Sequence, residues 1–268
     1  MERKLKMRYA MPFAAAALVL SSTAAFSADL AVSPVAPAVQ YSPSWSGFYA
    51  GAFVGWGWSN DDADTTGTTG FQNLGSTIVP GSLSLDDNGF NGGITAGYNM
   101  QSGSFVYGLE GDISYLDYDE SDSFTGVAGL GTRLQTRAER EMTFFGTFRG
   151  RLGYAPSDRF LLFATGGLAF GQVNYSASVT GLDAPTLVWS GSEDELKFGW
   201  TLGGGGEFKA TENVSIKLDG LYYDLADSSV TASGNAAVRA VGALNGIDYQ
   251  SETDNTGFLA RIGVNYQF

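Results

Sequence analysis

The chain has 268 residues and is rich in Gly (37), Phe (18) and Tyr (13), but only 16% of its residues are charged. It contains no His and no Cys, which excludes Ser-His-Asp catalysis, His-ligated metals, thiol nucleophiles and disulfides. The formal charge of −13 argues against a nucleic-acid partner, because phosphates require a cationic surface. No motif points to a metal or a cofactor, and we do not expect an enzyme.

Residues 1–27 have the features of a secretory signal peptide: a basic start, an apolar run over residues 11–20 and small residues before a cleavage site after Ser27 or Ala28. The apolar run is shorter than the roughly 20 residues that a membrane-spanning helix needs. Residues 28–45 hold three of the seven prolines and show no apolar period, which predicts an extended periplasmic leader. We therefore expect an exported protein whose fold occupies residues 46–268.

From residue 46 the dominant pattern is an alternation of apolar residues with small or polar ones. It is clearest in residues 48–58, where Phe, Ala, Val and Trp occupy every second position. The same period recurs in residues 90–98, 105–116, 142–154, 160–172, 197–209, 214–224 and 256–268. Each segment has about the 9–11 residues with which a tilted β-strand crosses a bilayer. We predict an all-β fold, an eight-stranded antiparallel up-and-down transmembrane β-barrel.

The connections between these segments alternate strictly between short and long. The short ones are residues 101–104, 155–158 and 210–213, and the long ones are residues 60–87, 117–141, 173–196 and 225–255. Short turns on one side and long loops on the other are typical of bacterial outer-membrane barrels, whose short turns face the periplasm. The alternation therefore predicts a protein of the bacterial outer membrane with both termini in the periplasm.

The two faces of the predicted strands differ in charge. One face carries large apolar side chains and no charge at its middle, which is typical of a lipid-facing surface. The other is rich in Gly, as a narrow lumen requires, and carries Glu110, Asp112, Arg149, Arg151, Glu207, Lys217, Asp219 and Arg261. These four acids and four bases predict an ion-pair network that fills the lumen, with Glu110 and Arg149 at similar height. The alternative is a gate or selectivity ring.

The long connections hold the excess of acidic residues. Residues 60–87 alone carry Asp61, Asp62, Asp64, Asp86 and Asp87 and no base. The group at residues 61–64 lacks the spacing and the Gly of an EF-hand, so we predict solvated acidic loops and no metal site. A lipopolysaccharide surface bridged by divalent cations is one environment that suits such loops. The expected partners are therefore outer-membrane lipid and lipopolysaccharide.

The C-terminus carries the most specific local pattern. Ile262, Val264, Tyr266 and Phe268 alternate on the predicted lipid face and end at the terminal aromatic residue. This resembles the assembly signal of outer-membrane barrels and implies the barrel assembly machinery as a partner. Residues 45–51, 108–112, 164–169 and 221–225 resemble the small surface-antigen porins of alphaproteobacteria. That family is similar in architecture to the opacity proteins and to the membrane domain of outer membrane protein A.

The resemblance implies an integral outer-membrane protein with an envelope-structural and surface role, at most a narrow passive pore. A haemin-binding or host-surface receptor in the long loops is the alternative. Two features argue against haemin binding. The absence of His leaves Tyr or Met as the axial ligand, and the acidic loops repel the haem propionates. An outer-membrane enzyme is the least favoured class, because barrel hydrolases and acyl transferases generally depend on His.

Overall fold

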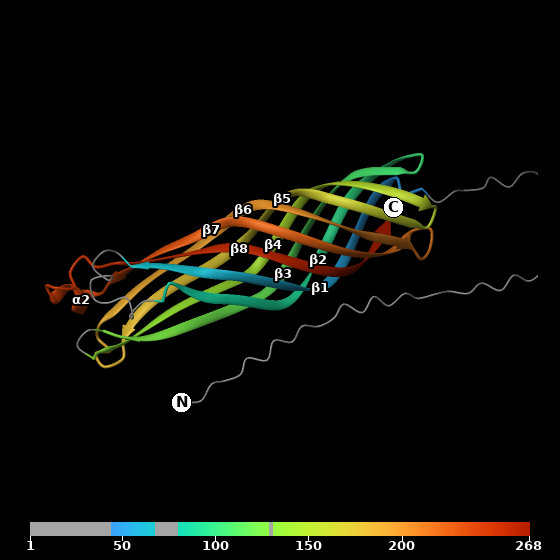
Figure 1. Ribbon diagram of the computed structural model, residues 1–268. Coiled ribbons are helices and arrows are strands. Elements are labelled where there is room, and N and C mark those ends of the chain that lie inside the picture. Colours follow the sequence, from blue (N-terminus) through green and yellow to red (C-terminus); the bar gives the residue numbers. More distant parts are fainter. Residues whose placement is uncertain (1–43, 68–79, 129–130) are drawn as a thin grey trace, which may run out of the picture. The chain divides into compact units, whose positions relative to one another are not determined.

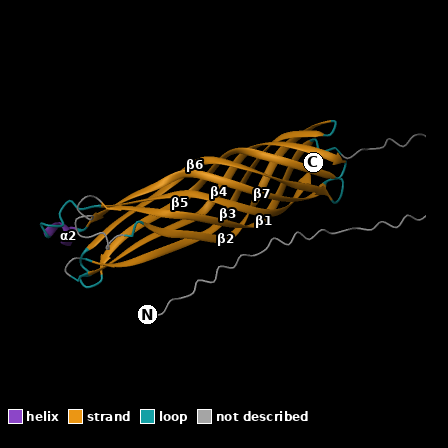
Figure 2. Ribbon diagram, viewed as in Figure 1, coloured by secondary structure: helices purple, strands orange, loops and turns teal. Residues whose placement is uncertain are grey.

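The computed structural model describes residues 44–67, 80–128 and 131–268, so the predicted signal peptide and most of the leader lie outside the described residues. The elements are β1 (Gly47–Gly67), β2 (Ser82–Ser102), β3 (Phe105–Val127), β4 (Arg133–Ser157), β5 (Phe160–Gly181), β6 (Val188–Lys209), β7 (Val214–Gly234), α2 (Ala236–Ala240) and β8 (Tyr249–Gln267). Each of these strands pairs antiparallel with the next, and β1 also pairs with β8, which closes the barrel (Figures 1 and 2). The predicted eight-stranded barrel is confirmed.

The barrel has two different ends. At one, which we call the turn end, β2, β4 and β6 connect to the following strands through tight turns, and the C-terminus lies there (Figure 1). At the other, the loop end, lie the remaining connections and α2 (Figure 2). None of the helices in the described part of the chain has the length and apolar character needed to cross a membrane.

The outer wall carries an apolar band between two rings of aromatic side chains. The turn-end girdle includes Phe48, Tyr98, Phe105, Tyr154, Tyr266 and Phe268, and the loop-end girdle includes Trp58, Phe144, Phe170, Phe198, Trp200, Tyr222 and Phe258. Residues 48–58 of β1 run from one girdle to the other, which matches the roughly 9–11 residues of a membrane-crossing strand. Aromatic rings of this kind mark the two interfaces of a bilayer.

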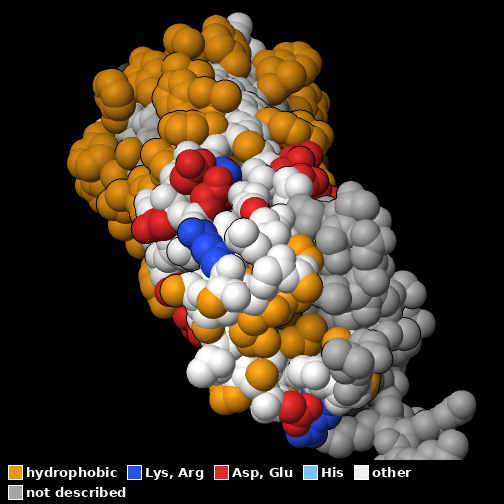
Figure 3. All heavy atoms as spheres, turned by 90° about the vertical axis from the view of Figure 1, so that its left-hand side faces the viewer, with side chains coloured by type: hydrophobic (Ala, Val, Ile, Leu, Met, Phe, Trp, Pro, Cys, Tyr) orange, Lys and Arg blue, Asp and Glu red, His pale blue; other side chains and the backbone are white. Residues whose placement is uncertain are grey.

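The strands are about twice as long as the sequence predicted, and the connections called long are mostly strand. On β5, Leu162 and Leu168 point outward within the band, whereas Val173 and Tyr175 beyond the girdle point inward. The alternation therefore continues beyond the girdle, but there the apolar side chains point into the barrel and the polar ones point outward, because the outer wall faces water. Figure 3 looks onto this end and shows acidic side chains gathered beside the apolar surface.

A β-bulge in β4 keeps the correct side chains inside. Met142 pairs with Val173 and Phe144 with Gln172, which leaves Thr143 as the extra residue. Inward positions are therefore even-numbered before the bulge, as at Met142, and odd-numbered after it, as at Phe145. Without this extra residue, every side chain on one side of the bulge would change face.

Glycines on the inner wall allow neighbouring strands and side chains to approach closely. A Cβ at Gly93 would lie 2.7 Å from the Cα of Ser114, and a Cβ at Gly167 would lie 2.7 Å from the Cα of Arg149. Neither distance is possible between real atoms, so any larger residue would push the strands apart. The glycines at these two positions therefore allow adjacent strands to approach closely on the inner face.

Candidate functional site

The eight charged residues predicted for the lumen lie together inside the barrel, at the level of the apolar band. Each of them has less than one-tenth of its surface exposed. Glu110 and Asp112 lie on β3, Arg149 and Arg151 on β4, Glu207 on β6, Lys217 and Asp219 on β7, and Arg261 on β8. We call this set the ionic layer. Its four acids and four bases are balanced in formal charge, so the layer needs no counterion.

Glu110 connects opposite walls of the barrel. It lies directly across from Arg149 in the β3–β4 register, and Arg149 Nη2 donates to Glu110 Oε1 at 2.6 Å. Lys217 Nζ, on the far strand β7, donates to both carboxylate oxygens at 2.8 Å. The hydroxyl of Tyr49 on β1 donates to Oε2 at 2.6 Å. One carboxylate thus holds together strands that are not neighbours in the sheet.

A second group of contacts continues the layer toward the loop end. Arg149 Nη2 also donates to Asp112 Oδ2 at 2.5 Å, and Thr147 donates to the same oxygen at 2.9 Å. Arg261 Nη2 donates to Asp219 Oδ2 at 2.5 Å, and Arg261 Nη1 lies 3.4 Å from Asp112 Oδ2. Because Arg261 belongs to β8 and Asp112 to β3, this pair also crosses the lumen.

Toward the turn end, Arg151 of β4 pairs with Glu207 of β6, over the intervening strand β5. Glu207 also accepts hydrogen bonds from Ser215 at 2.5 Å and from Asn265 at 2.8 Å. The Arg151 guanidinium lies 3.9 Å from the ring centroid of Phe163. A cation held over an aromatic face gains from the ring quadrupole, so the aromatic residues contribute to the layer as well as filling space.

Several members of the site were not predicted from the sequence. Tyr49, Phe53 and Phe163 line the lumen and contact its charges. Only charged residues and glycines were predicted for the lumen, although strict alternation from Phe48 and Leu162 already places all three aromatic residues on the inner face. Alternation rather than residue type was therefore the signal that could have identified them.

The prediction that Asp61 belongs to a solvated acidic loop is wrong. Asp61 lies on β1 and faces inward, and Arg140 Nη1 donates to its Oδ2 at 2.5 Å, with both side chains 2% exposed. The hydroxyl of Ser59 also donates to this carboxylate, at 2.6 Å, and that of Thr256 at 2.6 Å. The neighbours Asp62 and Asp64 are exposed, as predicted. Alternation separates them, because only odd positions of β1 face the lumen here.

Apolar clusters fill the lumen above and below these polar layers. The turn-end cluster contains Trp45, Val106, Ala155 and Leu161. The middle cluster contains Leu116, Tyr118, Met142, Phe145, Ala169, Val173, Leu221, Tyr223, Leu225 and Leu259. The loop-end cluster includes Leu83, Leu85, Leu134, Tyr175, Val179, Trp189, Val230 and Tyr249. Along β4 the inward side chains pass through all of these layers, from Leu134 to Ala155.

Trp45 blocks the mouth of the barrel at the turn end, although it precedes the first strand. Its side chain is 2% exposed, and Lys209 Nζ lies 4.8 Å from its ring centroid. Lys209 also donates to the carbonyl oxygen of Ser44 at 2.7 Å and to Gln267 Oε1 at 2.8 Å. Trp45 N donates to Gln101 Oε1 at 2.8 Å. The start of the fold is thereby fixed across the mouth of the barrel.

Three of the predicted assembly residues lie on the outer wall of β8, which pairs with both β7 and β1, and the fourth, Phe268, directly follows this strand. Ile262, Val264 and Tyr266 are each exposed by about half, and Phe268 is 77% exposed. Phe268 N donates to the Phe48 carbonyl at 3.0 Å, so the last residue still takes part in barrel closure. This arrangement leaves the aromatic end accessible from outside.

The arrangement is suited to blocking the lumen of the barrel, because the charged side chains of the ionic layer form ion pairs with one another. Among residues 44–67, 80–128 and 131–268, no three Asp or Glu side chains are grouped so that they could hold a metal ion. Balanced pairs of this type stabilise buried charge and fix the relative positions of strands.

Known proteins similar to this chain are outer-membrane proteins. The family described as "Outer membrane protein beta-barrel domain" matches residues 13–268. The 31 kDa outer-membrane immunogenic protein of Brucella melitensis biotype 1 is 34% identical over 92% of this chain and 95% of that protein. The 25 kDa outer-membrane immunogenic protein of Brucella canis is 30% identical over 94% of this chain and 95% of that protein. The crystal structure of OprG from Pseudomonas aeruginosa has a TM-score of 0.48 and 13% identity, covering 85% of this chain and 98% of OprG.

Proposed function

Because the chain belongs to the outer membrane β-barrel family, we propose that it is a closed, envelope-structural barrel that displays its loop end at the cell surface. The role is architectural and involves no catalysis. The observation that carries the proposal is the filling of the lumen by alternating apolar and ion-paired layers, from Trp45 at the turn end to Trp189 at the loop end.

The outward face supports the proposed orientation and partners. The two aromatic girdles fix the height of the barrel in the bilayer, and the turn end faces the periplasm, as short turns do in bacterial barrels. Beyond the loop-end girdle the outer wall carries exposed acids such as Asp62 and Asp64, which would meet lipopolysaccharide headgroups. The exposed pattern ending at Phe268 is suited to recognition by the barrel assembly machinery.

Planar-bilayer conductance of the refolded protein tests the proposal. We expect no long-lived open state in the parent protein. The double variant Asp112→Asn with Arg149→Ala thins the ionic layer without leaving an unpaired charge there, because Glu110 keeps Lys217 and Asp219 keeps Arg261. It should also stay closed, because the apolar clusters above and below remain. Open-channel currents of the size of a general porin in the parent protein would overturn the proposal.

A receptor for haemin or for a host surface remains the alternative, and it makes a different prediction. A receptor would bind its ligand at the loop end with the lumen still closed. Titration of refolded protein with haemin, followed by absorbance, separates the two roles. Saturable binding that is lost when residues 235–248 are shortened would favour the receptor, whereas no saturation favours the structural role.

A further inference from the structure

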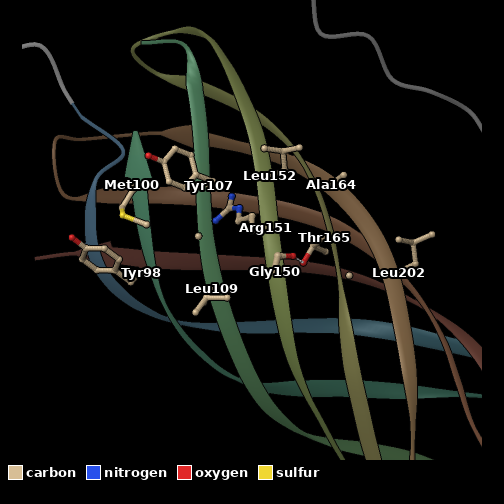
Figure 4. A pocket seen from close by; sticks show the side chains of 12 residues that line it. Tyr98, Met100, Tyr107, Leu109, Gly150, Arg151, Leu152, Ala164, Thr165 and Leu202 are labelled. Carbon is tan, nitrogen blue, oxygen red and sulfur yellow. Dashed lines mark hydrogen bonds between the residues drawn. The ribbon is translucent and has the colours of Figure 1, made fainter. Parts of the chain in front are cut away.

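An apolar groove interrupts the outer wall of the barrel within the membrane-facing band (Figure 4). Its volume is about 560 Å³, and it crosses β2 to β6 in the half of the band nearest the turn end. A single cross-strand row forms its centre, in which Leu109 pairs with Gly150, Gly150 with Gly166, and Gly166 with Leu202. The two glycines are the floor of the groove, and the two leucines are its walls.

The glycine at position 150 is not required by the packing of the barrel. A Cβ there would find its nearest neighbour, the Gly166 carbonyl oxygen, at 3.8 Å, which is an ordinary contact. The lumen-facing Gly167 differs, since a Cβ there would meet the Arg149 backbone at 2.7 Å. Gly150 therefore keeps a space open on the outside of the wall, and does not relieve crowding within it.

We propose that this groove holds one acyl chain of a phospholipid from the periplasmic leaflet. Its surroundings are continuous with the lipid-facing band, and Leu109, Leu152 and Leu202 are each more than half exposed around it. A lining of this kind recognises hydrocarbon through close van der Waals contact. Tyr107 stands on the turn-end side of the groove, and Tyr98 pairs with Leu109 at its edge. Amphipathic rings of this kind suit the region near a lipid headgroup.

The position of the groove selects its occupant. It lies next to the turn-end girdle, and in the orientation proposed above this end faces the periplasm, so the nearby lipids are phospholipids rather than lipopolysaccharide. The inference rests on that orientation but not on the closed state of the lumen. A change at Gly150 leaves all lumen contacts in place, so lipid retention and conductance can fail independently.

Native mass spectrometry of the full-length mature protein, purified from membranes in a mild detergent, provides the test. Gly150→Leu fills the groove. Gly206→Leu makes the same change on the outward face of β6 outside the groove, where a Cβ would meet the Phe160 ring at 3.5 Å and Leu162 Cδ2 at 3.8 Å, both ordinary contacts. We expect the parent and G206L proteins to retain a phospholipid, and G150L to lose it by roughly tenfold. Ala164→Leu fills the same groove from β5 and should reproduce the loss if G150L does not fold.

Three outcomes would overturn the inference. One is equal phospholipid retention in the parent and in the groove-filled variants. Another is retention of lipid A in place of a phospholipid, which would place the groove in the outer leaflet. The third is a dimeric parent that becomes monomeric in G150L and carries no lipid in either form, because a second copy of the chain would then occupy the groove.

Discussion

Arg149 is the residue on which the ionic layer depends most. Its guanidinium lies 2.6 Å from Glu110, 2.5 Å from Asp112 and 3.9 Å from Asp219, so three of the four acids share it. Lys217 holds Glu110 independently, and Arg261 contacts both aspartates. Removing Arg149 therefore leaves every acid near at least one base, but Asp112 and Asp219 must share Arg261, and four acids face three bases in a site shielded from water.

We expect Arg149→Ala to lower the free energy of unfolding by roughly 3–5 kcal/mol, because it leaves an uncompensated buried charge. Combining it with Asp112→Asn restores the balance of charge, leaves each remaining acid beside a base and should recover much of the loss. Urea unfolding of the refolded proteins in lipid vesicles measures both effects. If the single variant were as stable as the parent, water would have to reach the layer and screen it.

Asp183 shows how one carboxylate fixes a connection at the loop end. It lies between β5 and β6 and accepts hydrogen bonds from Arg133 N at 2.9 Å and from Arg133 Nη2 at 2.8 Å. Hydrogen bonding to the Arg133 side chain lowers the pKa of Asp183 from 3.8 to about 2. A lowered pKa means that the contact contributes fully above pH 3.8 and is lost as the pH falls through about 2.

We therefore expect the Asp183 carboxyl carbon to titrate near pH 2 in an NMR experiment on the protein in micelles. In Arg133→Gln the midpoint should return toward 3.8, the ordinary value. An unchanged midpoint in the variant would show that the Arg133 side chain does not hold the carboxylate.

At the scale of single elements, β8 must both close the barrel and end it. Deleting Phe268, or changing it to Asp, should lower the amount of protein in the outer membrane, because a strand that fails to pair leaves backbone groups unsatisfied in lipid at several kcal/mol each. Phe268→Tyr keeps the aromatic end and should insert normally. Immunoblots of membrane fractions, with heat-modifiable migration as the sign of folding, would decide. Normal insertion of the deletion would rule out this role for Phe268.

The strands show what alternation in a sequence can and cannot predict. Their number, order and lipid-facing residues followed from alternation, and the resemblance carried by residues 45–51 is confirmed by the relatives. Their length did not follow, because an apolar face was sought only where it points to lipid. On β5 the pattern continues beyond Phe170 with Val173 and Tyr175 facing inward. Beyond the girdle the outer wall faces water instead of lipid, so the same alternation there places the apolar side chains inside the barrel.

The candidate site could likewise be predicted only in part from the sequence. The eight charges could be assigned to one face by counting, and their balance suggested pairs, but the partners across the lumen depend on barrel closure. Lys217 reaches Glu110 only because β7 and β3 lie on opposite walls. The Asp61–Arg140 pair escaped because both residues were assigned to loops. Trp45 escaped because it precedes the strands and is positioned by side chains from several of them.

At the scale of the whole molecule, the orientation in the membrane can be tested with inserted tags. Gly242 and Gly103 lie at opposite ends of the barrel, and an added Cβ at either would meet no atom within 4 Å. We expect an antibody to reach a tag at Gly242 on intact cells, and a tag at Gly103 only after the outer membrane is opened. Labelling of Gly103 on intact cells would reverse the orientation.

The length of the strands has a consequence for recognition at the cell surface. Beyond the loop-end girdle the wall continues as paired strands, so a molecule that docks there meets side chains from neighbouring strands. The Arg137 side chain of β4, for example, donates to the Ser121 hydroxyl of β3 at 3.1 Å. Such an epitope is discontinuous in the sequence and exists only in the folded barrel. Synthetic peptides copied from residues 117–141 or 173–196 would present the right residues without the wall that arranges them. Sera raised against the folded protein should therefore lose most of their binding to this region once the barrel is unfolded.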